Sequence, residues 1–327
     1  MSSIATLGDL AHLHLLLNHA PTVGAAIAVG LLVLAFVRKN DHLAVVGLEL
    51  TFGVALVTIP VFLTGVAARA ALADADGVST GAITAHEDAA LFSFALMLIT
   101  GMVAWLALWQ RRRSARLVRG TVVMAFLLSC LTLSAMAKTA LEGGEIRHPE
   151  IVGAAGAAGE ASGAGEASEA GGGWLTAASV ANFVIQHEWV WPTSEALHFL
   201  GMSLMFGALL LVCLRLLGGM PSMSFAAAHR LLPFGLLGFA INVVTGMLFF
   251  IAAPEQYVDN VSFHWKIGLL ELSGASFLVL TVYDRLWTLP AGATPPPTAR
   301  ALGALTIALA VGVMYFGRML PFIGNAF

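Results

Sequence analysis

Eight long apolar stretches constrain the fold of this chain more than any other feature. Each is long enough to cross a bilayer, which takes about 20 mostly apolar residues in a helix. Hydrophobic residues make up 58% of the 327 residues and charged residues only 11%, whereas soluble domains carry about a quarter charged residues. The sequence therefore predicts an all-α, polytopic integral membrane protein with eight transmembrane helices, at 11–37, 43–70, 86–110, 118–141, 194–217, 229–252, 263–288 and 299–321.

A low-complexity segment divides these spans into two groups of four. Residues 154–173 consist entirely of Gly, Ala, Ser and Glu, a composition typical of a flexible linker. We expect a four-helix bundle at 1–150, a linker at 151–173 and a second four-helix bundle within 174–327.

An aromatic segment follows the linker. Residues 174–191 contain three tryptophans among other apolar residues, which predicts an amphipathic helix at the membrane interface. We expect Pro192 to end it and Thr193 or Ser194 to cap the next span.

The basic residues predict an orientation. With the N-terminus outside the cytoplasm, eleven of the sixteen lysines and arginines fall on the inner side, as the positive-inside rule requires. Both termini should then face the periplasm of a bacterial inner membrane. Because topology explains the basic residues, no nucleic-acid partner is expected. Five cations remain on the outer side: Arg69, Lys138, Arg147, Lys266 and Arg318.

The histidines gather on that same outer side. Only His42 and His229 fall on the inner side, and the other eight are His12, His14, His19, His86, His148, His187, His198 and His264. Histidine is costly in hydrocarbon and usually has a partner or a function there. A single interfacial histidine is more often solvated than a ligand, but eight on one side predict that the outer face carries the chemistry.

The histidine pattern favours haem over a bare metal ion. The chain has no His-Glu-x-x-His motif and no cysteines near the membrane rim, which argues against zinc. Without a Cys-x-x-Cys-His motif, covalent c-type haem is also excluded. A b-type haem needs imidazoles from separate helices, small residues against the ring and cations for its propionates. The metal-ligand candidates are His14, His19, His86, His148, His198 and His264, and the small residues are Gly24, Gly65, Gly101, Gly201, Gly207 and Gly246.

The five outer cations are the candidates for holding the haem propionates. For each of them, a simple snorkelling anchor at the interface is an equally good interpretation. Two acids lie inside predicted spans, Glu49 and Glu271. They are candidates for proton transfer or quinone binding, or else hydrogen-bonded structural carboxyls.

The first half resembles a bacterial family of four-helix membrane domains of unknown function with a suggested redox role. The resemblance lies in residues 14–21 (His-Leu-Leu-Leu-Asn-His-Ala-Pro), in His86 with Glu87, and in residues 143–148 (Gly-Gly-Glu-Ile-Arg-His). Ala20 stands where the family has an aromatic residue. The resemblance implies His14, His19, His86 and His148 as the redox-relevant set, and it leaves their pairing open.

The second half is similar to another uncharacterised bacterial membrane family. The similar stretches are residues 197–201, 214–218, 245–249 and 263–266. His198 fits that pattern, whereas His264 is an addition here and rests on position alone.

Together these features predict a b-type cytochrome-like subunit with two or more haems b. It would transfer electrons between the quinone pool and a periplasmic partner, such as a c-type cytochrome or another redox subunit, within a larger membrane complex. We expect no separate substrate chemistry of its own. One alternative is a haem-free membrane anchor or scaffold subunit of a respiratory complex. A metal-ion transporter is less favoured, because polar residues are sparse at the membrane midplane.

Overall fold

The computed structural model describes residues 7–72, 79–147, 175–290 and 292–323. Within these residues every regular element is helical, and eight helices are long and apolar enough to cross a membrane. The predicted fold class, an all-α polytopic membrane protein, is therefore confirmed. The predicted linker lies almost wholly outside the described residues, so the division into two domains stays a prediction.

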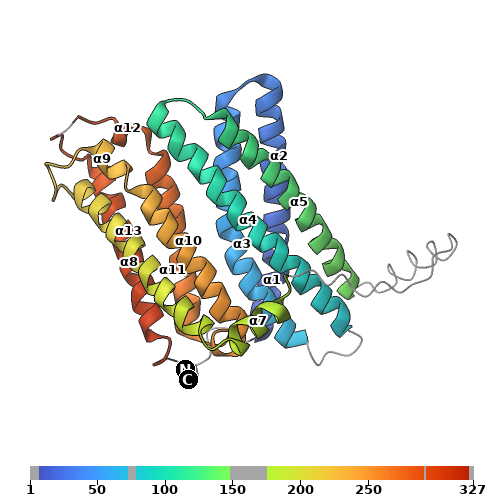
Figure 1. Ribbon diagram of the computed structural model, residues 1–327. Helices are drawn as coiled ribbons and strands as arrows, with labels where there is room; N and C mark the ends of the chain where they lie inside the picture. The colour runs from blue at the N-terminus through green and yellow to red at the C-terminus, as the bar shows by residue number, and fades with distance from the viewer. Residues whose placement is uncertain (1–6, 73–78, 148–174, 291, 324–327) are drawn as a thin grey trace.

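The first four spans are built from five helices that pack mainly against one another (Figure 1). They are α1 (Leu7–Leu17), α2 (His19–Arg38), α3 (Asp41–Leu72), α4 (Thr80–Ser114) and α5 (Arg119–Arg147). The first span is interrupted at Asn18, where α1 gives way to α2. At the other end of α2, Lys39 adopts a left-handed conformation and its N–H closes the helix.

The last four spans are α8 (Val190–Leu217), α10 (Leu232–Ala252), α11 (Val261–Val282) and α13 (Pro297–Met319). Short helices connect them: α9 (Phe225–His229), η1 (Pro254–Gln256) and α12 (Asp284–Trp287). Gly218 ends α8 in a left-handed conformation, which a residue without a Cβ adopts at low cost. At the start of α11 the Asn260 side chain accepts hydrogen bonds from the N–H groups of Ser262 and Phe263.

Two details of the seventh and fifth spans differ from the sequence prediction. The seventh span ends at Val282 and does not run to 288, because Arg112 of α4 and Trp287 of α12 donate to the last carbonyls of α11, those of Val282 and Leu280. Pro192 does not stop a helix either. It lies in the first turn of α8, where a missing N–H costs nothing, so Thr193 and Ser194 are not caps.

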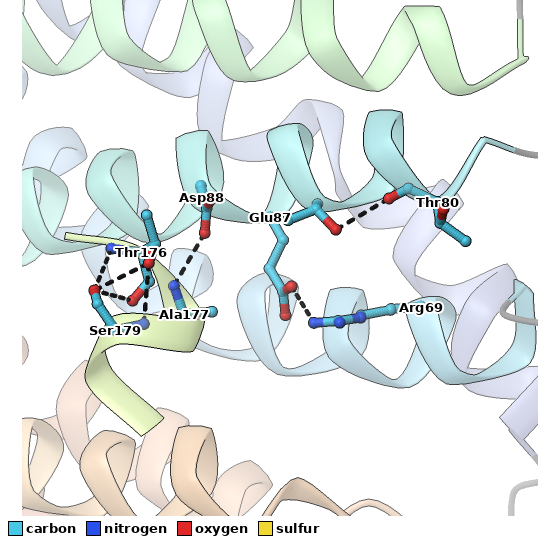
Figure 2. A network of polar contacts seen from close by, with 8 residues as sticks. Arg69, Thr80, Glu87, Asp88, Thr176, Ala177 and Ser179 are labelled. Carbon is cyan, nitrogen blue, oxygen red and sulfur yellow. Dashed lines mark hydrogen bonds and ion pairs between the residues drawn. The ribbon is translucent and has the colours of Figure 1, made fainter. Parts of the chain in front are cut away.

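The predicted interfacial helix is present as α7 (Ala177–Gln186), shorter than expected. Figure 1 shows α7 lying across the bundle at the end opposite α9 and α12. Figure 2 shows how it is attached: the Asp88 carboxylate of α4 accepts a hydrogen bond from the Ala177 N–H at 3.0 Å. Thr176 and Ser179 form a capping box at the same helix start.

The two groups of spans meet through α11, which packs against α3 and α4. Leu56 of α3 fills the space that a Cβ on Gly274 of α11 would need. On the same contact, the Trp105 indole N–H donates to the Thr281 hydroxyl at 2.8 Å. Large apolar side chains such as Leu16, Val37 and others point outward, as expected of a surface that faces lipid.

Candidate functional site

Alternating helix directions place most of the histidines at one end of the molecule. We call this the histidine end: α1, α4, α8 and α11 begin there, and α3, α5, α10 and α13 finish there. Among the described residues it carries His12, His14, His19, His86, His187, His198 and His264. His148 lies outside the described residues. The predicted clustering on one side of the membrane therefore holds for the part of the chain that the structure describes.

His14 is held in one orientation by α3. Its Nδ1 lies 3.0 Å from the Val61 carbonyl oxygen and 3.3 Å from the Thr64 hydroxyl. A carbonyl oxygen only accepts, so Nδ1 carries the proton and Nε2 keeps its lone pair. The ring lies against Gly65, where an added Cβ would come within 3.0 Å of the His14 Cε1 atom. A side chain at this position would require the imidazole to shift by a few tenths of an ångström.

His86 is held in the same way by α5. Its Nδ1 lies 2.9 Å from the Thr139 carbonyl oxygen, so this nitrogen is also the donor and Nε2 again keeps its lone pair. The ring lies against Gly143, where an added Cβ would stand 3.0 Å from the His86 Cε1 atom. The Thr139 hydroxyl bonds to Ser93 at 2.8 Å and so holds α4 and α5 together beneath the ring.

The two imidazoles lie in the same corner of the bundle. His14 packs against Gly65, one turn of α3 before Arg69, and Arg69 pairs with Glu87, the residue after His86. The two histidines are 72 positions apart in the sequence and are held by different helices. Orientation of a ligating imidazole through its second nitrogen is the usual arrangement at metal sites in proteins. The structure thus brings together two ligand candidates whose pairing the sequence left open.

His198 repeats this arrangement in the second half. Its Nδ1 lies 2.8 Å from the Thr245 hydroxyl. Thr245 donates its own proton to the Ile241 carbonyl at 2.7 Å, so it accepts from His198 and again leaves Nε2 with its lone pair. The ring lies over Gly246, with 3.8 Å between Cε1 and an added Cβ.

The remaining histidines of this end are less constrained. His19, at the start of α2, is exposed, as is His12. His264 uses Nε2 in a 2.7 Å hydrogen bond to the Val258 carbonyl, within its own connecting loop. His187 similarly bonds to the Phe183 carbonyl at 3.0 Å and is exposed. None of these side chains shares the glycine contact seen at His14, His86 and His198.

The five outer cations have different surroundings. Arg69 forms an ion pair with Glu87, the residue after His86 (Figure 2). Lys138 is exposed, and Arg318 is exposed beside the Phe322 ring, 5.3 Å from its centroid. Arg147 ends α5, but its side chain lies outside what the structure describes. Lys266 is half-buried, and its ammonium group lies along α13 at Gly317.

The two acids inside the spans lie apart from the histidines. Glu49 is half-buried towards the far end of α3, with Arg111 and Arg112 as its charged neighbours. Glu271 of α11 has a buried Oε1 atom without a hydrogen-bond partner among the described residues. Neither carboxylate takes part in the hydrogen bonds that orient His14, His86 and His198.

Sequence reasoning missed the residues that orient the imidazoles. Thr64 and Thr245 were not predicted as site residues, although each directly precedes a glycine that was, Gly65 or Gly246. A Thr-Gly pair near the outer end of a span, one span after a histidine, was the available signal. It is weak by itself, because Thr100 and Gly101 form the same pair in α4 and Gly101 packs against Ala55 instead.

Polar residues inside the first half also lie closer together than the sequence suggested. Thr100 and Thr132 bond to each other across the contact of α4 with α5 at 2.8 Å. With Thr51 and Ser129 they line a cavity of about 10 Å³, close to the volume that holds one water molecule. Within the described residues no group of three or more His, Cys, Asp or Glu side chains could hold a metal ion.

His229, at the opposite end of the molecule from the histidine end, is buried. It is 3% exposed. Its ring lies between those of Trp109 and Trp287, and the Trp109 indole donates to the His229 carbonyl at 3.2 Å. This aromatic cluster joins α4 to α9 and α12 and is a packing contact between the two halves.

Comparisons with known proteins give no relatives for this arrangement. No family model matches the chain, and neither a curated protein nor a solved structure does. The two family resemblances therefore stay interpretations, and what is established is a multi-helix membrane protein.

Proposed function

We propose that this chain is a haem-binding electron-transfer subunit of a bacterial inner membrane. The observation that carries the proposal is the pair formed by His14 and His86. They come from separate helices at the same corner of the bundle, on either side of the Arg69–Glu87 ion pair, and each donates Nδ1–H to a backbone carbonyl while keeping the Nε2 lone pair. Two such imidazoles are the donor set that a six-coordinate b-type haem requires.

The surroundings of the pair fit that group. Gly65 and Gly143 leave the space that each ring occupies, and a Cβ at either position would require the ring to shift by a few tenths of an ångström. The backbone hydrogen bonds fix the tautomer and raise the basicity of the ligating nitrogen. Both rings are half-buried in apolar helices, where water is scarce. When bound, the haem would supply reversible one-electron exchange, and the protein residues would set its position and its surroundings.

The rest of the proposal follows from the position of the site. The histidine end is the side that the positive-inside rule assigns to the periplasm. A haem near this surface suits exchange with a periplasmic redox partner, such as a c-type cytochrome, and with quinol in the adjacent bilayer. Lys138, Arg147, Lys266 and Arg318 remain candidates for the propionates. Arg69 already pairs with Glu87, so it is a weaker candidate than the others. His19 and His148 remain alternative ligands, and His264 is left out because its Nε2 is engaged.

A difference spectrum tests the proposal directly. The detergent-purified chain, reduced with dithionite, should show the α-band of a b-type haem, and a pyridine haemochrome assay gives haem per protein. His14→Ala and His86→Ala should each remove the same haem, whereas His42→Ala, at the other end, should leave the spectrum unchanged. A folded, colourless protein would refute the proposal and favour a haem-free anchor. Unchanged haem in both ligand variants would refute the ligand pair.

A further inference from the structure

The outer ends of α11 and α13 carry two cations without a counter-ion. Lys266 lies near the start of α11 and Arg318 near the end of α13, both at the histidine end. Neither of them forms an ion pair among the described residues. A charged side chain within a membrane span is costly without a partner, so an anion beside these two residues would stabilise the folded protein.

Hydrogen bonds and packing hold the two helix ends at the same level. The Asn260 side chain accepts from the first N–H groups of α11, and its Nδ2 donates to the Leu320 carbonyl after α13 at 3.0 Å. The Lys266 side chain lies along α13, with 3.6 Å between Nζ and a Cβ added at Gly317. Arg318 directly follows Gly317, so both cations lie at one depth of the molecule.

Exposed aromatic rings mark that depth as the membrane interface. Trp265, which is 53% exposed, stacks on Phe316 with 5.9 Å between the ring centroids. Tyr315, which is 55% exposed, lies 5.2 Å from the same ring. Tryptophan and tyrosine are enriched at the headgroup level of a bilayer. The two cations therefore lie where the phosphates of lipids are found.

Below Trp265, the outward side of α11 has room for an acyl chain. Trp265, Gly268 and Leu272 follow one another at spacings of three and four residues, which places them on one side of the helix. Trp265 and Leu272 are both more than half exposed. A Cβ added at Gly268 would meet no atom within 4 Å. The glycine therefore leaves open space between two exposed apolar side chains.

We propose that the outer ends of α11 and α13 bind an anionic phospholipid, whose phosphate group contacts Lys266 and Arg318. One acyl chain lies along Trp265, Gly268 and Leu272. A phosphate diester accepts charge-assisted hydrogen bonds from an ammonium and a guanidinium group together. A zwitterionic lipid carries its own cation next to the phosphate, so it gains less from this arrangement.

Haem propionates are also anions, but the lipid site lies on other helices than the proposed haem ligands. The corner with His14 and His86 is built by α1, α3, α4 and α5, whereas α13 packs mainly against α8 and α11. The inference therefore does not depend on the proposed function, and it applies equally to a haem-free protein.

Thermal unfolding of the full-length chain in detergent tests this inference. The probe is dioleoyl phosphatidylglycerol, and phosphatidylcholine with the same acyl chains is the reference. Phosphatidylglycerol should raise the Tm more than phosphatidylcholine. In the double variant Lys266→Gln, Arg318→Gln its affinity, taken from the lipid dependence of the Tm, should fall about fivefold for each cation removed. Lys138→Gln, which removes an exposed outer cation on α5, is the control and should leave the affinity unchanged.

A second variant separates lipid binding from stability. Gly268→Leu fills the open space on α11, so it should weaken the binding of phosphatidylglycerol. The same substitution removes a helical glycine and should raise the Tm measured without lipid. If the double variant does not fold, this variant decides, because an unchanged lipid affinity would contradict the position of the acyl chain.

Three results would overturn the lipid site. One is an equal response of the wild-type protein to the two lipids. Another is a rise in Tm with glycerol 3-phosphate that matches the rise with phosphatidylglycerol, which would assign the cations to a soluble phosphate compound. The third is a loss of haem in the double variant, which would assign the cations to the propionates. A colourless wild-type protein would overturn the proposed function and leave the lipid site in place.

Discussion

A single added methyl group at Gly143 should weaken haem binding, whereas the same change at Gly144 should not. In Gly143→Ala the new Cβ would lie 3.0 Å from the His86 Cε1 atom and 3.1 Å from Nδ1. Ordinary carbon contacts are about 3.5–4.0 Å, so the ring must retreat by about half an ångström. That movement strains the 2.9 Å hydrogen bond to Thr139. At Gly144 no atom lies within 4 Å of the added Cβ.

The size of the effect follows from this contrast. Overpacking of a fixed side chain costs about 1–3 kcal/mol. Replacing glycine by alanine in a helix stabilises the helix by up to about 1 kcal/mol. Gly143→Ala and Gly144→Ala both gain this, so the difference between them isolates the clash with His86. Without haem the His86 ring can rotate away, whereas an iron-bound ring cannot. The cost therefore falls on binding, and the haem dissociation constant should be about 5- to 150-fold higher in Gly143→Ala than in Gly144→Ala.

Haem titration into the apoprotein, followed at the Soret band, measures that ratio. Gly65→Ala should behave like Gly143→Ala, because its Cβ would lie 3.0 Å from the His14 Cε1 atom. Gly53→Ala is its control on the same helix, since nothing lies within 4 Å there. Gly246→Ala makes only an ordinary 3.8 Å contact and should be tolerated. Equal dissociation constants for Gly143→Ala and Gly144→Ala would refute the idea that these glycines hold imidazoles in ligand position.

Three further changes probe other contacts of the structure. Thr281→Val leaves the buried Trp105 indole N–H without its acceptor. The free energy of unfolding should fall by about 1–3 kcal/mol, and the Tm in detergent should fall with it. An unchanged Tm would show that the two halves do not depend on this bond. Arg69→Ala removes an ion pair to Glu87 whose arginine is 49% exposed, so the free energy of unfolding should change by less than about 1 kcal/mol. A larger loss would mean that the pair is shielded from water. Asp88→Ala removes the side chain that holds the first turn of α7. Losing this hydrogen bond should destabilise α7 by about 1 kcal/mol and accelerate its amide exchange by about fivefold. Equal exchange rates in the two proteins would show that other contacts anchor α7.

The sequence by itself determined the membrane architecture. Long apolar runs have no stable alternative in a bilayer, because a helix is the one local structure that satisfies all its own backbone hydrogen bonds there. The eight spans could therefore be read from composition and length. The one-sided distribution of histidines followed from the same count of spans, because alternating helices assign each residue to an end of the molecule. The predicted end of the seventh span was wrong, because it depends on residues outside that helix. Arg112 and Trp287 donate hydrogen bonds to its last carbonyls.

Only the tertiary structure decided which histidines are held in one orientation by a neighbouring helix. Eight of them looked alike in sequence, since position along a span says nothing about the helix face that a neighbour covers. The orientations of His14 and His86 depend on carbonyls and glycines of two other helices, α3 and α5. Hydrophobicity is a property of each segment and can be summed along the chain, whereas the orientation of an imidazole is set by atoms that only folding brings to it.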